Sequence, residues 1–188
     1  MPPSVPSLPA PQKIHSRLKH NLPLSLGSEY SIRLFRRYFE RMDDAFYMST
    51  KVLRFQRRDN EANVNDRLLD EMLKQFQNEI ENTLSSLTHT YSADKNFSSE
   101  SFAYDHTTEF QAACSTHISV RLLNIYEKLD HLLALCDALE IIGLLSPDNA
   151  HKLVQSWVRR FRQFCTQVNE VKRNCFPARQ PSKHAVTP

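Results

Sequence analysis

The sequence predicts a mainly α-helical protein, with four helices and one short strand, for three reasons. The chain of 188 residues holds 2 Gly, although sheets and tight turns consume glycine. Apolar residues recur at spacings of three and four over most of its length. One stretch, TTEFQAACS at residues 107–115, alternates instead with period two. A chain of this size has room for one domain with a sizeable core.

The N-terminal end is predicted to be a flexible arm. Residues 1–27 are rich in Pro and Ser and carry scattered basic side chains at Lys13, Arg17 and Lys19. They lack the apolar segment of a signal peptide, and no apolar run in the chain approaches the ~20 residues that span a bilayer. We therefore expect a cytoplasmic protein that makes no contact with a membrane.

A single helical domain is expected over residues 28–174. Ser28 is a plausible N-cap, and the apolar residues from Ile32 onward predict a first helix to about residue 55. After the linker QRRDNEANVN, an apolar stripe at mostly four-residue spacing predicts the second helix. Its members are Val64, Leu68, Met72, Phe76, Ile80, Leu84 and Leu87.

The second half of the domain begins with a polar connection over residues 89–106, which leads to the strand. Ser115 or Thr116 can cap the third helix, which has a very wide apolar face and stops at Gly143. Ser146-Pro147-Asp148 combines an N-cap, a proline at the first position and an acid, so it predicts the start of the fourth helix. Residues 175–188 are expected to be a disordered basic tail.

The predicted strand has no good partner elsewhere in the sequence. Its backbone N–H and C=O groups would be unpaired along both edges. Strand, helix, turn, helix over about 105–174 is the order of a ribbon-helix-helix unit, in which strands from two copies pair and enter the major groove of DNA. We therefore expect a ribbon-helix-helix-like homodimer. Its core would contain Phe110, Ala112, Leu122, Leu129, Leu133 and Trp157.

The outward side chains of such a ribbon would read base edges. They are Thr107, Glu109 and Gln111. The amide of Gln111 has the geometry to bond N6 and N7 of adenine, and Glu109 can accept a hydrogen bond from N4 of cytosine. The same pattern is also that of an ordinary solvated strand face, in which Glu109 would pair with a neighbouring arginine.

Charge is distributed unevenly along the chain, whose net charge is +3. Residues 1–58 carry 11 Lys and Arg against 4 acids, residues 59–130 carry 5 against 13, and residues 131–188 carry 8 against 4. Basic ends around an acidic middle indicate either a surface for nucleic acid or pairing within the chain. The candidate contacts to DNA phosphates are Lys13, Arg17, Lys19, Arg33, Arg36, Arg37, Arg41, Arg159, Arg160 and Arg162.

Two qualifications apply to these phosphate contacts. The arginines of the first helix could instead pair with Asp66, Asp70 and Glu71 of the second helix. The N-terminus of the fourth helix is a poor phosphate anchor, because Pro147 has no N–H and Asp148 would repel an anion.

An enzyme is not expected. His106, Glu109 and His117 lie close together in the sequence, but their spacing does not give the geometry of metal ligands. The chain has no glycine-rich phosphate loop, nucleophile elbow or zinc-binding helix motif. Its four cysteines lack zinc spacing, so buried free thiols are predicted, and no metal or cofactor is expected; the thiols on apolar faces are Cys114, Cys136 and Cys165.

Residues from about 104 to 173 resemble the AcaB-type transcriptional regulators encoded on IncC-type conjugative plasmids and integrative elements. The resemblance is carried by Leu129-Asp130 in a leucine-rich helix, by the turn LEIIGLLS at residues 139–146, and by Trp157 before a basic run. It implies a dimeric, ribbon-helix-helix-like activator of conjugative transfer genes. The predicted ribbon would present its outward side chains twice, related by the dimer axis, so we expect the preferred site in double-stranded DNA to be an inverted repeat. RNA polymerase is a further expected partner.

The residues themselves leave activator and repressor open. They also leave open a rival interpretation, in which the protein is a non-enzymatic, dimeric, helical interaction protein of a conjugation or integrative-element system.

Overall fold

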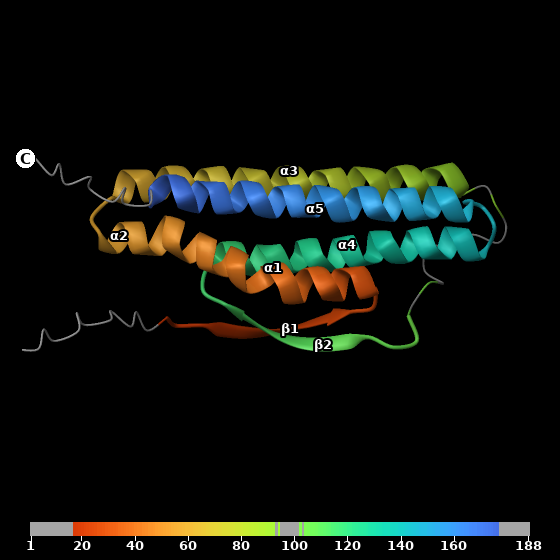
Figure 1. Cartoon of the computed structure of the whole chain (residues 1–188), viewed down its shortest axis with the longest axis horizontal. Helices are drawn as coiled ribbons and strands as arrows, with labels where there is room; N and C mark the ends of the chain where they lie inside the picture. The colour runs from red at the N-terminus through yellow and green to blue at the C-terminus, as the bar shows by residue number, and fades with distance from the viewer. Residues whose placement is uncertain (1–16, 93, 95–101, 103, 177–188) are drawn as a thin grey trace, which may run out of the picture.

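The computed structural model describes residues 17–92, 94, 102 and 104–176, and it combines four long helices with a two-stranded antiparallel sheet (Figure 1). The mainly helical fold that the sequence predicts is therefore confirmed, with a second strand added. In chain order the elements are β1 (His20–Leu26), α1 (Glu29–Tyr47), the π-helical turn η1 (Met48–Val52), α2 (Leu53–Phe55), α3 (Asp59–Tyr91), β2 (Thr108–Cys114), α4 (His117–Ile141) and α5 (Pro147–Cys175).

The helices form a bundle, and the sheet lies along one side of it, next to α1 and α4 (Figure 1). Helices α1 and α5 run in one direction, and α3 and α4 run in the other. Because α3 and α4 are parallel, the chain must return along the bundle between them, and β2 makes this return. β2, which pairs with β1, is thus part of the connection between α3 and α4.

The partner of the predicted strand comes from the same chain. β1 pairs with β2 in an antiparallel register that runs from His20 opposite Cys114 to Leu26 opposite Thr108. The expectation that a second copy supplies the partner strand is therefore wrong, and so is the ribbon-helix-helix dimer in the form predicted. The assignment of residues 20–26 to a flexible arm is wrong for the same reason, because these residues form β1.

The residues expected in a dimer core are buried within one chain. Ala112, Leu122, Leu129, Leu133 and Trp157 are all buried, and Phe110 packs against the same core. The wide apolar face of α4 is explained by its position, because α4 contacts α1, α3, α5 and both strands. A single chain therefore covers the apolar surface that had been assigned to a second copy.

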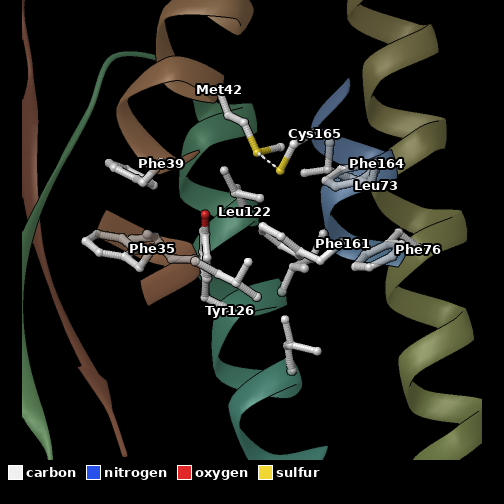
Figure 2. Packing of buried hydrophobic residues seen from close by; sticks show 14 of the residues in the cluster. Phe35, Phe39, Met42, Leu73, Phe76, Leu122, Tyr126, Phe161, Phe164 and Cys165 are labelled. Atoms are coloured by element: carbon white, nitrogen blue, oxygen red, sulfur yellow. Dashed lines mark hydrogen bonds between the residues drawn. The ribbon is translucent and has the colours of Figure 1, made fainter. Parts of the chain in front are cut away.

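Aromatic rings fill the centre of the bundle (Figure 2). The ring of Tyr126 on α4 lies 5.2 Å from that of Phe35 on α1 and 5.0 Å from that of Phe161 on α5, measured between centroids. Phe76 on α3 stacks on Phe164 at 4.7 Å. One aromatic cluster thus links all four long helices, and pairs of this kind add to the free energy gained by burying their surface.

The predicted helix ends agree with the structure where capping residues mark them. The Thr116 hydroxyl accepts a hydrogen bond from the Ser119 amide at 3.1 Å, and Ser146 caps α5 through the amide of Asn149. Gly143 ends α4 with φ of +76°, a left-handed conformation that glycine adopts without strain. The predicted tail begins too early, because α5 continues to Cys175. Residues 177–188 and Lys13 lie outside the described residues.

Candidate nucleic-acid interface

A carboxylate of α4 holds the turn between β1 and α1. Asp130 Oδ2 accepts a hydrogen bond from the Gly27 amide at 2.9 Å, and Oδ1 accepts one from the Ser28 amide at 2.8 Å. The chain also packs closely here, because a Cβ atom added to Gly27 would lie 2.0 Å from the ring of Tyr104. The end of β1 is therefore fixed to α4 and to the segment that precedes β2.

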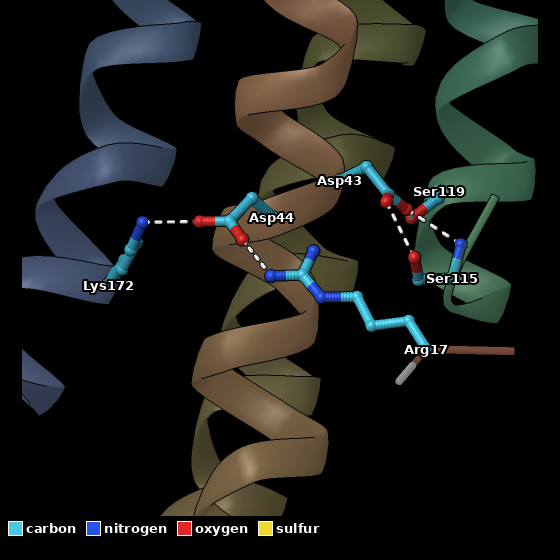
Figure 3. Close-up of polar contacts among 6 residues, drawn as sticks. All are labelled: Arg17, Asp43, Asp44, Ser115, Ser119 and Lys172. Atoms are coloured by element: carbon cyan, nitrogen blue, oxygen red, sulfur yellow. Dashed lines mark hydrogen bonds and ion pairs between the residues drawn. The ribbon is translucent and has the colours of Figure 1, made fainter. Parts of the chain in front are cut away.

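A carboxylate of α1 holds the turn between β2 and α4 (Figure 3). Asp43 accepts hydrogen bonds from the amide and the hydroxyl of Ser115, at 2.8 and 2.7 Å, and from the hydroxyl of Ser119 at 2.6 Å. Asp43 is almost fully buried, and such a carboxylate is costly unless it is well hydrogen-bonded. The two carboxylates together position the ribbon on the bundle.

The outer face of the ribbon is polar and exposed. Alternate residues of each strand point toward the helices, and the residues between them point to solvent. On β2 the outward residues include Glu109 and Gln111, as the sequence predicts. Opposite them on β1 lie Ser25 and Pro23, with Asn21 beyond. Sequence reasoning missed the residues of β1, whose signal was the alternation of Leu22, Leu24 and Leu26.

The third predicted base-reading residue, Thr107, is exposed and lies just before β2. Its hydroxyl donates a hydrogen bond to Glu109 at 3.4 Å. Among the residues that the structure describes, no arginine forms an ion pair with Glu109, and Gln111 forms no side-chain hydrogen bond. The structure thus brings Thr107, Glu109 and Gln111 to one exposed surface, where the side chain of Gln111 is available to a ligand.

The arginines of α1 form an exposed basic stripe next to this ribbon. The guanidinium of Arg36 lies 5.7 Å from the ring centroid of Phe110 on β2, which places it at the edge of the ribbon. Arg37 lies 5.5 Å from the ring centroid of Tyr38, and Arg41 is exposed one turn further along. Arg33 pairs with Glu29 of the same helix. Within the described ranges, Arg36, Arg37 and Arg41 have no carboxylate partner.

The alternative of pairing between the first two long helices is wrong for these arginines. Asp66 pairs with Arg54, which lies beyond α1, in α2. Asp70 pairs with Lys74, at 3.1 Å, and with Arg121 of α4. Asp66 and Asp70 therefore pair with other basic residues, and the exposed Glu71 forms no ion pair with any described residue. The arginines of α1 stay exposed on the opposite side of the helix from the core.

Arg17 is used within the fold (Figure 3). Its guanidinium pairs with Asp44 on α1 and lies 4.4 Å from the ring centroid of Tyr47, while Lys172 of α5 contacts the other oxygen of Asp44. Burial alone would raise the pKa of the Asp44 carboxyl, but the hydrogen bonds from Lys172 and Arg17 lower it overall. Because Arg17 and Lys172 neutralise Asp44, they are poor candidates for phosphate contacts.

The arginines of α5 divide into two groups. Arg160 lies 4.9 Å from the ring centroid of Trp157 and 3.8 Å from Glu79, so it faces α3. Arg159 and Arg162 are exposed and follow Gln155, which bonds Tyr30 of α1, by four and seven residues. This spacing places both on the side of α5 that faces α1. They extend the basic surface of α1, whereas Arg160 does not.

The cysteines and histidines form no second site in the described part of the chain. All four cysteines are buried free thiols, and burial raises the pKa of Cys136 to about 12. His106 and His117 are exposed. Among the described residues, no three of the His, Cys, Asp and Glu side chains are grouped so that they could bind a metal ion. None of the described helices is both long and apolar enough to cross a membrane.

Comparison with known proteins shows the fold. No family model matches the chain, and no curated protein matches it in sequence. Among solved structures, the chain is similar to selenomethionine-containing AcaB from uropathogenic E. coli, with a TM-score of 0.77 and 16% sequence identity. The match covers 85% of this chain and 82% of AcaB. The chain therefore has the AcaB fold, in agreement with the resemblance to AcaB-type proteins in its leucine-rich helix, LEIIGLLS turn and Trp157 segment.

Proposed function

We propose that the protein is a DNA-binding regulator that contacts duplex DNA through the outer face of the β1–β2 ribbon and through arginines of α1. One observation carries this proposal: the ribbon presents a polar, exposed face beside a helix whose Arg36, Arg37 and Arg41 have no carboxylate partner in the described ranges. The AcaB fold and the resemblance to AcaB-type regulators support the same class of function.

The ribbon suits the major groove in size and chemistry. A two-stranded ribbon fits this groove, whose floor offers donors and acceptors in a pattern that differs for each base pair. Gln111 would bond adenine, and Asn21 on β1 adds a second amide on the same outer face. Arg36 and Arg37 would contact the phosphates at the wall of the groove, where positive charge releases counterions.

Because one chain completes the ribbon, the number of protein copies expected on one DNA site changes. Each copy would place its own ribbon in a groove, so an inverted repeat would require two copies bound side by side. The homodimer and the activation of transfer genes, which the resemblance implies, remain parts of this proposal, and RNA polymerase remains a further expected partner.

The salt dependence of binding to a duplex tests the phosphate contacts. Fluorescence anisotropy with a labelled duplex from the region upstream of the neighbouring genes would give the slope of log K against log salt concentration. If Arg37 contacts one phosphate, Arg37→Ala should reduce that slope by roughly one unit. Lys74→Ala on α3 removes the same charge far from the ribbon and should leave the slope unchanged. Equal slopes for both variants would contradict the proposed surface.

Base reading is tested separately with Gln111→Ala. At one fixed salt concentration, this variant should bind the preferred site more weakly by about 1–3 kcal/mol and a scrambled duplex almost as well as before. A parallel loss on both duplexes would mean that Gln111 supports the fold or a backbone contact. No loss on either duplex would place base reading elsewhere, most directly on α1.

The second candidate function is that of a helical interaction protein, and exposed apolar residues of α3 favour it. Val64 is 64% exposed and Leu68, one turn later, is 46% exposed. Two such residues on one side of a helix are typical of a small contact surface. This candidate predicts no salt-dependent affinity for duplex DNA, so the anisotropy measurement separates the two functions.

A further inference from the structure

We propose that a pocket at the C-terminal end of α4 binds an arginine side chain presented by a segment of a partner protein, with an apolar neighbour of that arginine in contact with Ile141. The end of α4 lies where the chain turns into α5 (Figure 1). The inference does not rest on the proposed DNA binding, because the pocket uses none of the residues assigned to DNA and every measurement below is made without DNA.

The pocket is small and mostly apolar. It measures about 210 Å³, and its apolar lining comes from Ala134, Ala138 and Ile141 of α4 and from Phe102 and Tyr104 of the segment before β2. Sites for small-molecule ligands usually measure about 300–1,000 Å³, so this pocket suits a single side chain better. Ile141 is 84% exposed and offers further apolar contact area at its edge.

Two side chains of the pocket are held in place by the fold. The hydroxyl of Tyr104 donates a hydrogen bond to Asp137 Oδ2 at 2.9 Å. The ring of Tyr104 packs against Gly27 so closely that a Cβ atom there would lie 2.0 Å from it, and Asp130 of α4 binds the Gly27 amide. An aromatic ring and a carboxylate are therefore positioned before any ligand arrives, which lowers the entropic cost of binding.

The charged side chains that line the pocket have one sign. They are the carboxylates of Asp105 and Asp137, and no Lys or Arg lines it. Asp105 is exposed and forms no hydrogen bond or ion pair with any described residue. Asp137 bonds Tyr104 through one oxygen, and within the described ranges it has no cationic partner. Both carboxylates are therefore available to a cation.

The surroundings of the pocket carry negative charge as well, although the whole chain has a net charge of +3. Residues 129–151 contain four acids and no Lys or Arg, and residues 102–120 contain two acids and no Lys or Arg. The C-terminus of α4 adds the partial negative charge of a helix end. Such a region attracts a cationic side chain and repels the phosphates of a nucleic acid, so the partner is a protein.

Arginine fits this pocket better than lysine does. Its planar guanidinium pairs with carboxylates in a fork geometry and also stacks on aromatic rings, whereas the ammonium of lysine is a compact, strongly hydrated charge. The guanidinium would pair with Asp105 and Asp137 and lie against the ring of Tyr104. Ile141 would contact the apolar residue next to this arginine, which adds selectivity for its sequence context.

Selection from a random decapeptide library displayed on phage, with the intact protein as bait, tests the inference. We expect the enriched peptides to carry an arginine next to an apolar residue. Fluorescence anisotropy then gives the affinity of a labelled synthetic copy of one such peptide. Citrulline keeps the shape of the arginine side chain without its charge, so the same peptide with citrulline should bind more weakly by about tenfold or more.

A matched pair of variants locates the contact. Asp137→Asn keeps an acceptor for the Tyr104 hydroxyl and removes the charge, so the arginine peptide should bind it about tenfold more weakly. Glu140→Gln removes the same charge from an exposed position of α4 that does not line the pocket, and it should bind as the wild type does. In the wild-type protein, the amide NMR signals of Ala134, Ala138 and Ile141 should shift when the peptide binds.

Four results would overturn the inference. They are a selection that enriches no arginine, full affinity of the citrulline peptide, unchanged signals of the three α4 amides, and equal losses for Asp137→Asn and Glu140→Gln. Equal losses would mean that the peptide responds to the net charge of the protein alone. A wild-type protein that sediments as a dimer and becomes monomeric in Asp137→Asn would also overturn it, because a second copy would then occupy the pocket.

Discussion

The carboxylate of Asp130 accepts a hydrogen bond from the backbone amide of Ser28 at 2.8 Å, across 102 positions of sequence. Its other oxygen binds the adjacent amide of Gly27. Asp130 thus accepts hydrogen bonds from the amides of the turn before α1, as Asp43 accepts one from the Ser115 amide in the turn before α4. Each of the two helices beneath the ribbon holds the turn that leads into the other, and the ribbon is fixed at both of its connections to the bundle.

Loss of the Asp130 carboxylate should destabilise the fold. Asp130→Ala removes two charge-assisted hydrogen bonds and leaves two amides without an acceptor, so we expect a loss of about 2–4 kcal/mol in the free energy of unfolding. Urea unfolding followed by circular dichroism measures it. Glu127→Ala removes an exposed carboxylate from the same helix and should change stability by less than about 0.5 kcal/mol. Equal effects of the two substitutions would show that the turn does not depend on Asp130.

The helices could be predicted from the sequence more reliably than the ribbon, and the reason is local. Ser146-Pro147 and Thr116 mark helix starts through interactions within a few residues, which the sequence contains. β1 depends on a strand 90 positions away, as the pair Leu22–Ala112 shows. Its own alternation is short, and Pro23 in its middle is typical of a loop.

The outward direction of Glu109 and Gln111 could be predicted, because it follows from period two alone. Glu109 and Gln111 point outward on β2 whichever strand lies beside it. The choice of partner strand could not be made in the same way. The wide apolar face of α4 was attributed to a second copy, whereas α1, α3, α5 and the ribbon cover it. Burial on every side of a helix looks the same in sequence whether one chain or two provide it.

Amide exchange along β2 should alternate, because Pro23 has no N–H and its pair with Gln111 is therefore one that exchanges no hydrogen bonds. The amides of Phe110 and Ala112 point toward β1 and should be protected, whereas those of Glu109, Gln111 and Ala113 should exchange rapidly in the free protein. Residue-resolved exchange by NMR provides the measurement. Protection of all five amides would show that another segment pairs with the outer edge of β2.

The ion pairs of Asp44 should make stability depend on pH in the acid range. Lys172 and Arg17 lower its pKa in the folded state below the unfolded value of about 3.9. The stabilisation is therefore fully present above the unfolded pKa and is lost as pH falls from about 4 through the folded pKa. Asp44→Asn should be less stable than wild type at pH 7, with a difference below about 1 kcal/mol because the pairs are partly exposed.

At pH 3 the difference between Asp44→Asn and wild type should shrink, and urea midpoints at the two pH values would measure this. Asp148→Asn serves as a control, since the pair that Asp148 forms with Lys152 is largely exposed and should contribute little at either pH. A difference for Asp44→Asn that grew toward pH 3 would contradict the assigned direction of the pKa shift.

Replacement of the buried Tyr126 by phenylalanine should stabilise the protein. Tyr126 is fully buried between aromatic rings of α1 and α5, and no described protein group accepts or donates a hydrogen bond at its hydroxyl (Figure 2). A buried hydroxyl without a partner costs about 1–3 kcal/mol, whereas phenylalanine keeps the ring contacts. We expect Tyr126→Phe to raise the free energy of unfolding by about 1 kcal/mol, and thermal and urea unfolding would both report it.

Tyr104→Phe is the matched contrast, because the Tyr104 hydroxyl donates a hydrogen bond to Asp137 at 2.9 Å. Loss of this bond should lower the free energy of unfolding by about 0.5–1.5 kcal/mol. A fall in stability for Tyr126→Phe as large as that for Tyr104→Phe would show that the Tyr126 hydroxyl is hydrogen-bonded in solution.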